Sequence, residues 1–413
     1  MLNTLLNVKR KFSDGSNMLV GQLAENKEGV YFQYDDSYLA SHPKSLSPFL
    51  IKADNSLQKA PKTPHYGLHG VFGDSLPDGW GLYLMDRVFR ANGYNPKMVT
   101  ALKRLAYMGE RCSGALYYEP VMSFSATNER DIDLITLGKE AVKEFEGMGS
   151  VFLNSLMDAS GSGGARPKLN VTKCANGLFS THADAIGEKL IIKLTSDRFS
   201  LQHSESLVEY AYMKMARNVG IEVPDFELLA AGNGRFWLQQ ARFDCSAQGR
   251  YHMISACGLL DAPFREPSLD YIDLARVTRH LCGVEEAQKL VKRAFFNYLT
   301  VNQDDHAKNF AFLADDTDNW RLSPFYDVVY MPSPYNEHMT SFNGNGKVIT
   351  PSALEQLAGQ AGFSGITPLK NMLEEIYDET HRFQSIANEL EIDKSLAATI
   401  AQHMEQKWSD LKI

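Results

Sequence analysis

The sequence lacks the features that mark secreted, disulfide-stabilised and membrane proteins. It has only five cysteines, an odd number, and none forms the CxxC pair used by metal sites and redox motifs. No run of 18 apolar residues is present, and residues 1–10 contain no apolar core of a signal peptide. We therefore expect a cytoplasmic protein with free thiols and no membrane partner. The cysteines are Cys112, Cys174, Cys245, Cys257 and Cys282.

An excess of positive charge is also absent. The chain has 42 Lys and Arg residues against 50 Asp and Glu residues, which gives a net charge of −8. Proteins that bind nucleic acid on their own need a basic surface, so this balance argues against direct binding of DNA or RNA. With 413 residues, of which 44% are hydrophobic, the chain is long enough for two lobes with separate cores.

The first part of the chain predicts a β-rich domain followed by a connector. Apolar and polar residues alternate between turns up to about residue 60, as is typical of short antiparallel strands. Residues 121–155 are polar and acidic, which is typical of a connector. The other expected elements are a helix after the turn at 74–81 that runs to about Arg90, a helix at about 97–108, a strand at 115–118 and a helix near 137–146.

After residue 160 the pattern changes to a mixed α/β half and then a mostly helical half. Strands are expected at 168–172, 189–194, 226–230 and 235–239, with a helix at about 205–219. After Phe243 the strand signals fade, and helices are expected at 270–281, 284–300, 351–360, 368–389 and 394–411. This order predicts an α+β fold with two lobes and a ligand in the crevice between them.

A run of polar residues near the C-terminal third has the spacing of a phosphotransferase site. Asp304 is followed five residues later by Asn309, and Asp327 lies eighteen residues beyond Asn309. In such a site the first carboxylate orients and deprotonates a hydroxyl, while the amide oxygen and the last carboxylate hold Mg²⁺. Taken alone, the run also fits a polar loop after a helix with solvated carboxylates.

The glycine-rich segment 160–168 predicts a phosphate-binding loop. Glycines permit a positive φ and let backbone amides approach an anion, although no Walker A motif is present. A flexible linker is the alternative. Lys193 follows in an apolar strand, where an ammonium group is costly unless an anion pairs with it or it reaches solvent. Glu205 or Glu209 could form an ion pair with Lys193, and Glu209 lies on the helix face that suits this pairing better. Gln240 lies where a hinge between the lobes would read adenine through backbone groups, unless the strand simply ends there.

Nearly the whole chain resembles the HipA family of serine/threonine kinase toxins from bacterial toxin–antitoxin systems. The two motifs nearest the C-terminus are the most specific part of the resemblance. The matching segments are the early strands that end at Leu46–Pro48, Leu76–Gly81, Gly109–Gly114, Gly164–Lys168, Ile191–Lys193, Val223–Asp225, Arg242–Asp244, Asp304–Asn309 and Pro324–Asp327.

The resemblance implies a protein-kinase-like fold that binds ATP and Mg²⁺. Asp304 resembles the catalytic base, Asn309 and Asp327 the metal ligands, and Lys193 the lysine that contacts the ATP phosphates. The family also autophosphorylates a serine in its glycine-rich loop, where Gly161 stands here between Ser160 and Ser162, the two candidates. The residues expected to bind ATP are Lys193, Gly163, Gly164, Ala165, Arg166, Lys168, Glu209, Gln240, Ala241, His306 and Lys308. His306 is also expected to order its loop, and Asp305 to be structural.

The implied domains are a β-rich HipA-like subdomain at 1–120, a connector at 121–155, the nucleotide-binding part of the N-lobe at 156–243 and a helical catalytic C-lobe at 244–413. The implied partners are a small helix-turn-helix antitoxin like HipB, which would make any DNA contact, and a protein substrate such as glutamyl-tRNA synthetase. Two alternatives stay open: a non-catalytic co-repressor or scaffold that binds the antitoxin, and a kinase for a small molecule.

Overall fold

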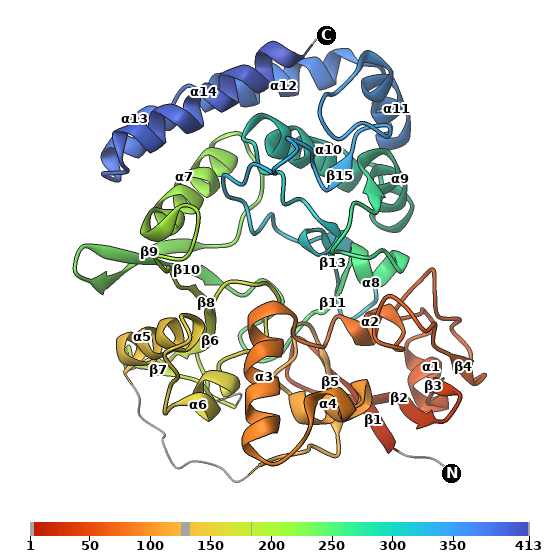
Figure 1. The fold of residues 1–413 in the computed structure, drawn as a ribbon. Helices are drawn as coiled ribbons and strands as arrows, with labels where there is room; N and C mark the ends of the chain where they lie inside the picture. The colour runs from red at the N-terminus through yellow and green to blue at the C-terminus, as the bar shows by residue number, and fades with distance from the viewer. Residues whose placement is uncertain (1–3, 125–132, 183, 412–413) are drawn as a thin grey trace. The chain divides into compact units, whose positions relative to one another are not determined.

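The computed structural model describes residues 4–124, 133–182 and 184–411 (Figure 1). Its described part divides into two compact units, which we call unit 1 and unit 2. Unit 1 consists of Met1–Arg198, Leu229–Asp261 and Leu313–Asn319, and unit 2 of Phe199–Leu228, Ala262–Phe312 and Trp320–Ile413. No helix of the described ranges is long and apolar enough to cross a membrane.

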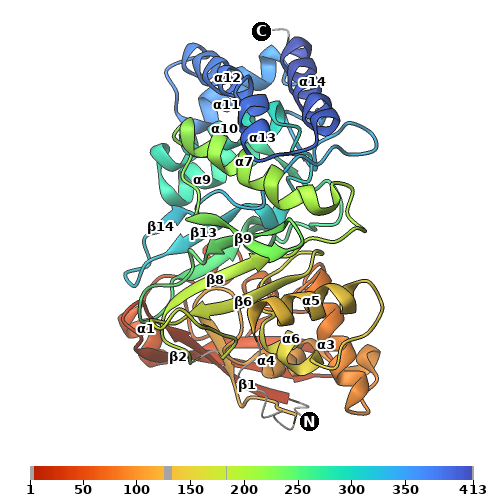
Figure 2. The ribbon, with the colours of Figure 1, turned by 90° about the vertical axis from the view of Figure 1, so that its left-hand side faces the viewer.

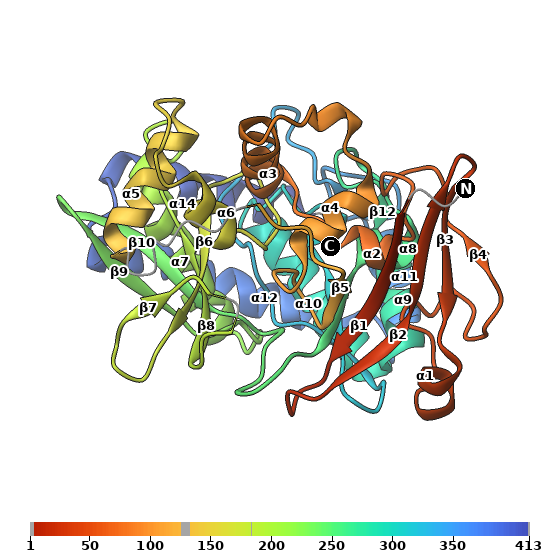
Figure 3. The same cartoon turned by 90° about the horizontal axis from the view of Figure 1, so that it is seen from below.

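Unit 1 begins with a five-stranded sheet of order β4-β3-β2-β1-β5, in which every neighbouring pair is antiparallel (Figure 3). Alternate residues of β1, such as Leu6 and Val8, are buried. This alternation confirms the antiparallel strands predicted for the first 60 residues. The strands are β1 (Thr4–Lys11), β2 (Asn17–Asn26), β3 (Gly29–Tyr34), β4 (Gln58–Lys59) and β5 (Leu116–Glu119).

The helices of unit 1 partly match the expectation. The second helix begins at Ala101 and not near Lys97, because the Thr100 hydroxyl caps it by accepting a hydrogen bond from Lys103 N (3.4 Å). Of the connector predicted at 121–155, residues 125–132 lie outside the described ranges, and two helices occupy much of the rest. The helices are α1 (Asp36–Ser41), α2 (Gly70–Gly73), α3 (Gly79–Ala91), α4 (Ala101–Met108), α5 (Leu134–Phe145), α6 (Leu153–Asp158) and α8 (Ala256–Leu260), with a 3₁₀ turn η1 (Pro96–Met98).

The second sheet, which belongs to unit 1 except for the start of β9, has the order β7-β6-β8-β10-β9, and β6 lies beside β8 (Figure 2). In β8, Leu190 and Ile192 are buried, whereas Lys189, Ile191 and Lys193 point to the other, partly exposed face. The predicted strands are confirmed, although β9 and β10 each continue two residues further than expected. The bounds are β6 (Lys168–Lys173), β7 (Phe179–Ser180), β8 (Glu188–Lys193), β9 (Phe226–Gly232) and β10 (Arg235–Ala241).

A buried ion pair ties the end of β10 to the loop before β5. Arg242 donates to both carboxylate oxygens of Asp244, through Nε (3.0 Å) and Nη2 (2.6 Å), and Asp244 also accepts from Gly114 N (2.7 Å). Burial alone would raise the pKa of Asp244, but Arg242 outweighs burial and holds that pKa at about 2.

Unit 2 is mostly helical. Its helices are α7 (Glu205–Asn218), α9 (Tyr271–Cys282), α10 (Val284–Leu299), α11 (Pro351–Ala361), α12 (Thr367–Thr380), α13 (Phe383–Glu389) and α14 (Lys394–Asp410), with 3₁₀ turns η2 (Gln202–Ser204) and η3 (Ala307–Asn309). The single helix predicted at 368–389 was wrong, because the chain breaks between α12 and α13. The break lets the buried Phe383 pack edge-to-face on Tyr212 of α7, with ring centroids 5.9 Å apart.

The expectation that strands fade after Phe243 needs a correction. Five strands of two to four residues occur there, too short for alternation of side chains to reveal them in the sequence. They are β11 (His252–Ser255), β12 (Leu269–Asp270), β13 (Ala311–Ala314), β14 (Trp320–Leu322) and β15 (Thr340–Ser341). In unit 2, β12 pairs with β15 in parallel.

Candidate active site

The predicted catalytic loop follows α10 in unit 2. Asp304 and Asn309 are partly exposed, whereas Asp305 and Ala307 between them are buried. The Asn309 side-chain amide donates to the main-chain carbonyl of Asp304 (2.8 Å) through its nitrogen. The loop therefore presents Asp304 and Asn309 together.

The segment that follows Asp327 lies alongside this loop. Asn302 and Met331 form a parallel bridge, and Gln303 N donates to Met331 O (3.1 Å). Nearer the site, the Tyr326 hydroxyl donates to Lys308 O (2.6 Å). These bonds bring the chain segments that carry Asp304, Asn309 and Asp327 into one region of unit 2.

Strained backbone flanks the site on both sides. Val301 has φ +58° and Asp327 has φ +56°. A positive φ is unusual for any residue with a side chain and is most costly for a β-branched one such as Val301. Such conformations persist only where the surrounding structure fixes them, and here the bridge to Met331 and the burial of Val301 do so.

Asp305 fixes the loop from its buried side. One carboxylate oxygen accepts from the Tyr271 hydroxyl (2.7 Å) and His338 Nδ1 (2.9 Å), and the other from the backbone amides of Met339 (2.8 Å) and Thr340 (3.3 Å). Burial, together with the Asp305 charge, raises the pKa of Tyr271 well above its usual range, so this hydroxyl stays a donor. This agrees with the prediction that Asp305 is structural.

His306 and Lys308 shape the turn of the loop. His306 Nδ1 accepts from Lys308 N (3.2 Å) at the start of η3, which is the ordering role predicted for His306. The Lys308 ammonium lies 4.5 Å from the ring centroid of Phe264. A role for either residue in binding ATP stays a prediction.

The glycine-rich loop of unit 1 packs against the start of α3. Gly164 N donates to the Asp78 carboxylate, and Trp80 N donates to Gly164 O (3.0 Å). The Lys168 ammonium donates to Gly163 O, which closes the loop. Gly164 needs its glycine, because its φ is +108° and a Cβ would lie 2.4 Å from the Lys168 ammonium nitrogen.

The second sheet places the predicted lysines side by side. Lys168 and Lys193 are directly opposite each other on β6 and β8, and so project from the same face. Gln240 projects from that face too, because it pairs with Ile191, two residues before Lys193. Ala241 projects from the opposite face, so any adenine contact there would be through its backbone.

The two candidate serines differ in accessibility. Ser160 is buried, and its hydroxyl donates to Met157 O (2.8 Å). Ser162 is partly exposed, and its hydroxyl lies 3.1 Å from the side-chain amide of Asn170. Between them, a Cβ on Gly161 would lie 2.0 Å from Arg111 O, so no serine fits there without rearrangement.

The donors near the catalytic loop suit Mg²⁺. An amide oxygen from Asn309 and a carboxylate from Asp327 are hard oxygen ligands, and Mg²⁺ in phosphotransferases takes few protein ligands and completes its shell with phosphates and water. In the part of the chain that the structure describes, no three His, Cys, Asp or Glu side chains cluster as a metal site of their own.

The predicted residues thus fall into two groups. Unit 1 holds the loop 160–168, Lys193, Gln240 and Ala241, and unit 2 holds Asp304–Asn309, Asp327 and Glu209, which is buried on α7. The pairing of Lys193 with Glu209 stays a prediction. The sequence did not reveal the donors to Asp305, because these partners lie far away along the chain and carry no local motif. It did not reveal the role of Asp78 either, because the Leu76–Gly81 turn that contains Asp78 does not indicate a contact with Gly164.

Comparison with known proteins agrees with this architecture. Residues 160–409 match the HipA-like C-terminal domain, and residues 15–119 match the HipA N-terminal domain. A chain from the complex of HipA, HipB and operator DNA of Shewanella oneidensis MR-1 has the same fold, with a TM-score of 0.68 and 16% identity over 98% of this chain and 96% of that one. The Helicobacter pylori kinase CtkA gives a TM-score of 0.42 and 14% identity over 61% and 91% of the two chains, too low a score to support an argument.

A curated relative is the candidate kinase Y4dM of Sinorhizobium fredii. It is 24% identical over 239 residues, which are 54% of this chain and 57% of Y4dM, so the match spans little more than half of that protein. The two domain matches together cover most of the present sequence. The chain therefore belongs to the HipA family and has its kinase-like fold, a mixed α/β part with a small β-rich subdomain and a mostly helical part.

Proposed function

We propose that this chain is an ATP- and Mg²⁺-dependent kinase that phosphorylates serine or threonine hydroxyls of a protein, and that it acts as the toxin of a toxin–antitoxin pair. The observation that carries the proposal is the catalytic loop, where Asp304 and Asn309 are presented together beside the segment of Asp327. In phosphoryl transfer the protein mainly positions the reacting groups and stabilises their charge. The hydrogen bonds to Asp305 fix this loop on its buried side, as such positioning requires.

Each group has a role that its position supports. Asp304 orients the acceptor hydroxyl and takes its proton, and Asn309 and Asp327 supply oxygen ligands for Mg²⁺. Bound Mg²⁺ neutralises charge on the phosphates. Lys168 and Lys193, opposite each other on one face of the sheet, offer two positive charges to a polyphosphate, which offsets the cost of placing like charges side by side.

The experiment is phosphotransfer from labelled ATP with Mg²⁺ to proteins of a cell lysate. We expect labelled protein with the wild type and a loss of about 10²–10⁴-fold in rate with Asp304→Asn. Label that appears only in small molecules would favour a small-molecule kinase, and no label with intact antitoxin binding would favour a scaffold. A lysate band at the mass of glutamyl-tRNA synthetase, repeated with the purified enzyme, tests that substrate.

An antitoxin partner is proposed from the HipA–HipB–DNA complex, whose HipA chain shares this fold. The net charge of −8 suits a protein that reaches DNA through a basic partner. Co-expression with a helix-turn-helix protein encoded next to this chain should relieve growth arrest and give a complex that binds DNA. The isolated chain should not bind that DNA.

Self-inhibition through the glycine-rich loop is also proposed, with Ser162 as the modified residue. Ser162 is partly exposed, whereas the Ser160 hydroxyl is buried and bonded to Met157 O. A phosphate on Ser162 would place a dianion in the loop and repel the phosphates of ATP. Mass spectrometry after incubation with ATP should find phosphate on Ser162, and Ser162→Ala should remove it while Ser160→Ala should not. Phosphate on Ser160 in the wild type would contradict the assignment.

A further inference from the structure

The segment that follows Asp327 forms an exposed turn of unit 2, and the residue before Asp304 holds this turn in place. Gln303 is 1% exposed, so its side chain lies under the surface beside Asp304. Its Oε1 accepts a hydrogen bond from Ser333 N (2.7 Å), and its Nε2 donates to Asn336 Oδ1 (2.9 Å). Both ends of the turn are therefore bonded to one side chain of the predicted catalytic loop.

The residue after Asp304 holds the continuation of the same segment. Asp305 is fully buried and accepts hydrogen bonds from His338 Nδ1 (2.9 Å) and from the backbone amides of Met339 (2.8 Å) and Thr340 (3.3 Å). The two neighbours of Asp304 thus bind the segment on both sides of the turn. Asp304 itself is partly exposed, so the turn is fixed relative to the residue proposed as the base.

The sequence of the turn also favours its shape. Asn336 N donates to Ser333 O (3.1 Å), which closes a four-residue β-turn, and Glu337 N donates to Ser333 Oγ (2.8 Å). Pro334 stands at the second position, where proline has the required φ in advance, and Asn336 adopts a φ of +55°, which asparagine tolerates. Tyr335 occupies the third position, at the tip of the turn.

Tyr335 presents an aromatic ring to solvent. It is 78% exposed, whereas Tyr330, five residues earlier on the same segment, is 6% exposed. Pro332 and Pro334 beside it are exposed too. The fold gains little from an apolar ring that stays in water. A ring on a fixed turn, however, loses little conformational entropy when another molecule packs on it, and this favours binding.

The charge next to the turn is balanced. Glu337 forms an ion pair with Lys347 (3.3 Å), and both side chains are about half exposed. Such a pair on the surface leaves no net charge to attract an ionic ligand. The turn therefore offers the apolar surface of Tyr335 and its two neighbouring prolines, which suits an uncharged apolar side chain.

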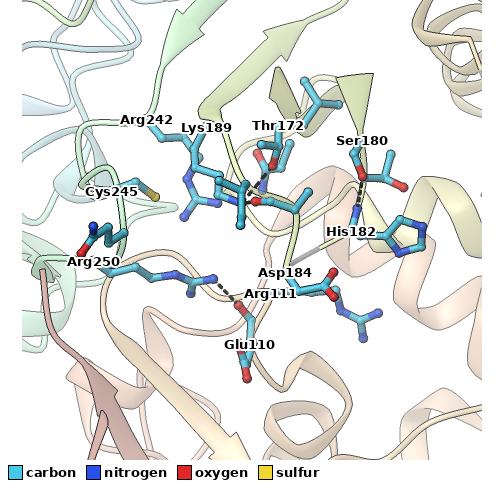
Figure 4. Close-up of a pocket in the computed structure, with 18 of the residues that line it drawn as sticks. Glu110, Arg111, Thr172, Ser180, His182, Asp184, Lys189, Arg242, Cys245 and Arg250 are labelled. Atoms are coloured by element: carbon cyan, nitrogen blue, oxygen red, sulfur yellow. Dashed lines mark hydrogen bonds between the residues drawn. The ribbon is translucent and has the colours of Figure 1, made fainter. Parts of the chain in front are cut away.

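The polar pocket of unit 1 is a different kind of surface (Figure 4). Mostly charged and polar side chains line it. Arg250 donates there to the main-chain carbonyl of Glu110 (2.7 Å), and Arg111 pairs with the Asp158 carboxylate (2.5 Å). An apolar side chain of another protein therefore matches the exposed turn better than this pocket.

We propose that Tyr335 determines specificity by binding the acceptor protein: an apolar or aromatic side chain of an extended acceptor segment packs on the ring while the segment's hydroxyl lies at Asp304. This inference rests on the proposed kinase function and names a polypeptide as its substrate class. The Gln303 side chain separates the backbone of the catalytic loop from that of the turn. A few extended residues, at about 3.3 Å each, span such a separation.

The test is phosphorylation of a peptide library by the full chain with labelled ATP and Mg²⁺. Each peptide has a central serine and one flanking position fixed to a single amino acid. We expect the wild type to favour an apolar or aromatic residue at one flanking position by about fivefold, less than a closed apolar pocket gives. Tyr335→Ala should lose this preference, and Tyr335→Phe should keep it, because the ring makes the contact. Tyr66→Ala, which removes a tyrosine of unit 1 that is 58% exposed, is the control and should keep it.

Kinetics with the preferred peptide separate binding from chemistry. In Tyr335→Ala the KM for the peptide should rise about fivefold, and the KM for ATP should stay as in the wild type. Urea unfolding should also match the wild type, because the substitution lies at an exposed position. A fall in kcat with an unchanged KM for the peptide would contradict a contact between Tyr335 and the acceptor.

The other outcomes distinguish this inference from the proposed function. Equal peptide preference in Tyr335→Ala and wild type would overturn the role of Tyr335 and leave the kinase function standing. Labelled lysate proteins without any labelled peptide would overturn the extended acceptor segment. If the wild type labels neither proteins nor peptides, the proposed protein kinase function fails, and this inference fails with it.

Discussion

The two adjacent aspartates of the predicted catalytic loop should respond oppositely to the same substitution. Asp305→Asn keeps the shape of the side chain but replaces one carboxylate oxygen with an amide that donates. Two of the four donors to Asp305, either the Tyr271 and His338 pair or the Met339 and Thr340 amides, then face a donor. Hydrogen bonds to a buried charge contribute about 1.5–3 kcal/mol each. Because the Tyr271 hydroxyl can rotate to accept a hydrogen bond from the new amide, we expect the free energy of unfolding to fall by only about 2–4 kcal/mol.

Asp304→Asn should be nearly neutral for stability. Asp304 is partly exposed, and its main-chain carbonyl, which accepts from the Asn309 amide, is unchanged by the substitution. We expect a change within about 0.5 kcal/mol. Phosphotransfer should nevertheless fall about 10²–10⁴-fold, since the base is gone. The Asp304→Asn variant therefore measures the effect on phosphotransfer, and the Asp305→Asn variant measures the effect on the stability of the loop.

Two measurements check this contrast. Urea unfolding followed by circular dichroism gives the loss of stability. Hydrogen exchange of the Met339 and Thr340 amides shows which oxygen was replaced, because these amides lose their acceptor only if the new side-chain amide of Asp305→Asn faces them. The reasoning is refuted if both variants unfold at the same urea concentration.

Two further predictions concern buried charge in unit 1. Asp244→Asn should destabilise the protein by about 3–5 kcal/mol in urea unfolding, because it leaves the Arg242 charge buried, whereas the same change at the exposed Asp225 should cost little. Burial lowers the pKa of His252 to about 4, with its Nε2 bonded to Leu46 O (2.9 Å), so His252 is neutral in the folded protein. The free energy of unfolding that depends on this neutral His252 is present above about pH 6.5 and is lost as the pH falls toward 4, roughly 3 kcal/mol in total. His252→Gln keeps a donor for Leu46 O and should flatten the pH profile of urea unfolding. An unaltered profile would contradict His252 as the origin of the pH dependence.

The sequence predicted correctly those helices and strands whose formation depends on the periodicity of their own residues. The strands β6 and β8 and the helix α7 follow from alternation and helical periodicity over six or more residues. The start of α4 was misplaced because Thr100, a capping residue, outweighs the periodicity that extends to Lys97. The break before Phe383 depends on a contact with α7 that no local signal describes.

The candidate site divides in the same way. The spacing of Asp304, Asn309 and Asp327 is local enough to read from the chain, and it predicted the loop that the structure forms. The donors that hold Asp305 are 33 to 35 residues away in sequence at His338, Met339 and Thr340, so only the fold brings them together. The roles of the site residues in binding and catalysis stay predictions until the variants are measured.

Asp304 and Asp305 show how a residue proposed for catalysis and a residue that stabilises the loop can be neighbours in the sequence. Asp304 is partly exposed and Asp305 is buried, although a sequence alone presents them as one patch of negative charge. The contacts of Asp305 therefore hold the loop from its buried side. The strained φ of Val301 is maintained by the burial of Val301 and by Met331 N, which donates to the Val301 carbonyl (3.1 Å). Substitutions on the exposed side should alter catalysis without unfolding, and substitutions on the buried side should loosen the loop first and slow catalysis as a consequence.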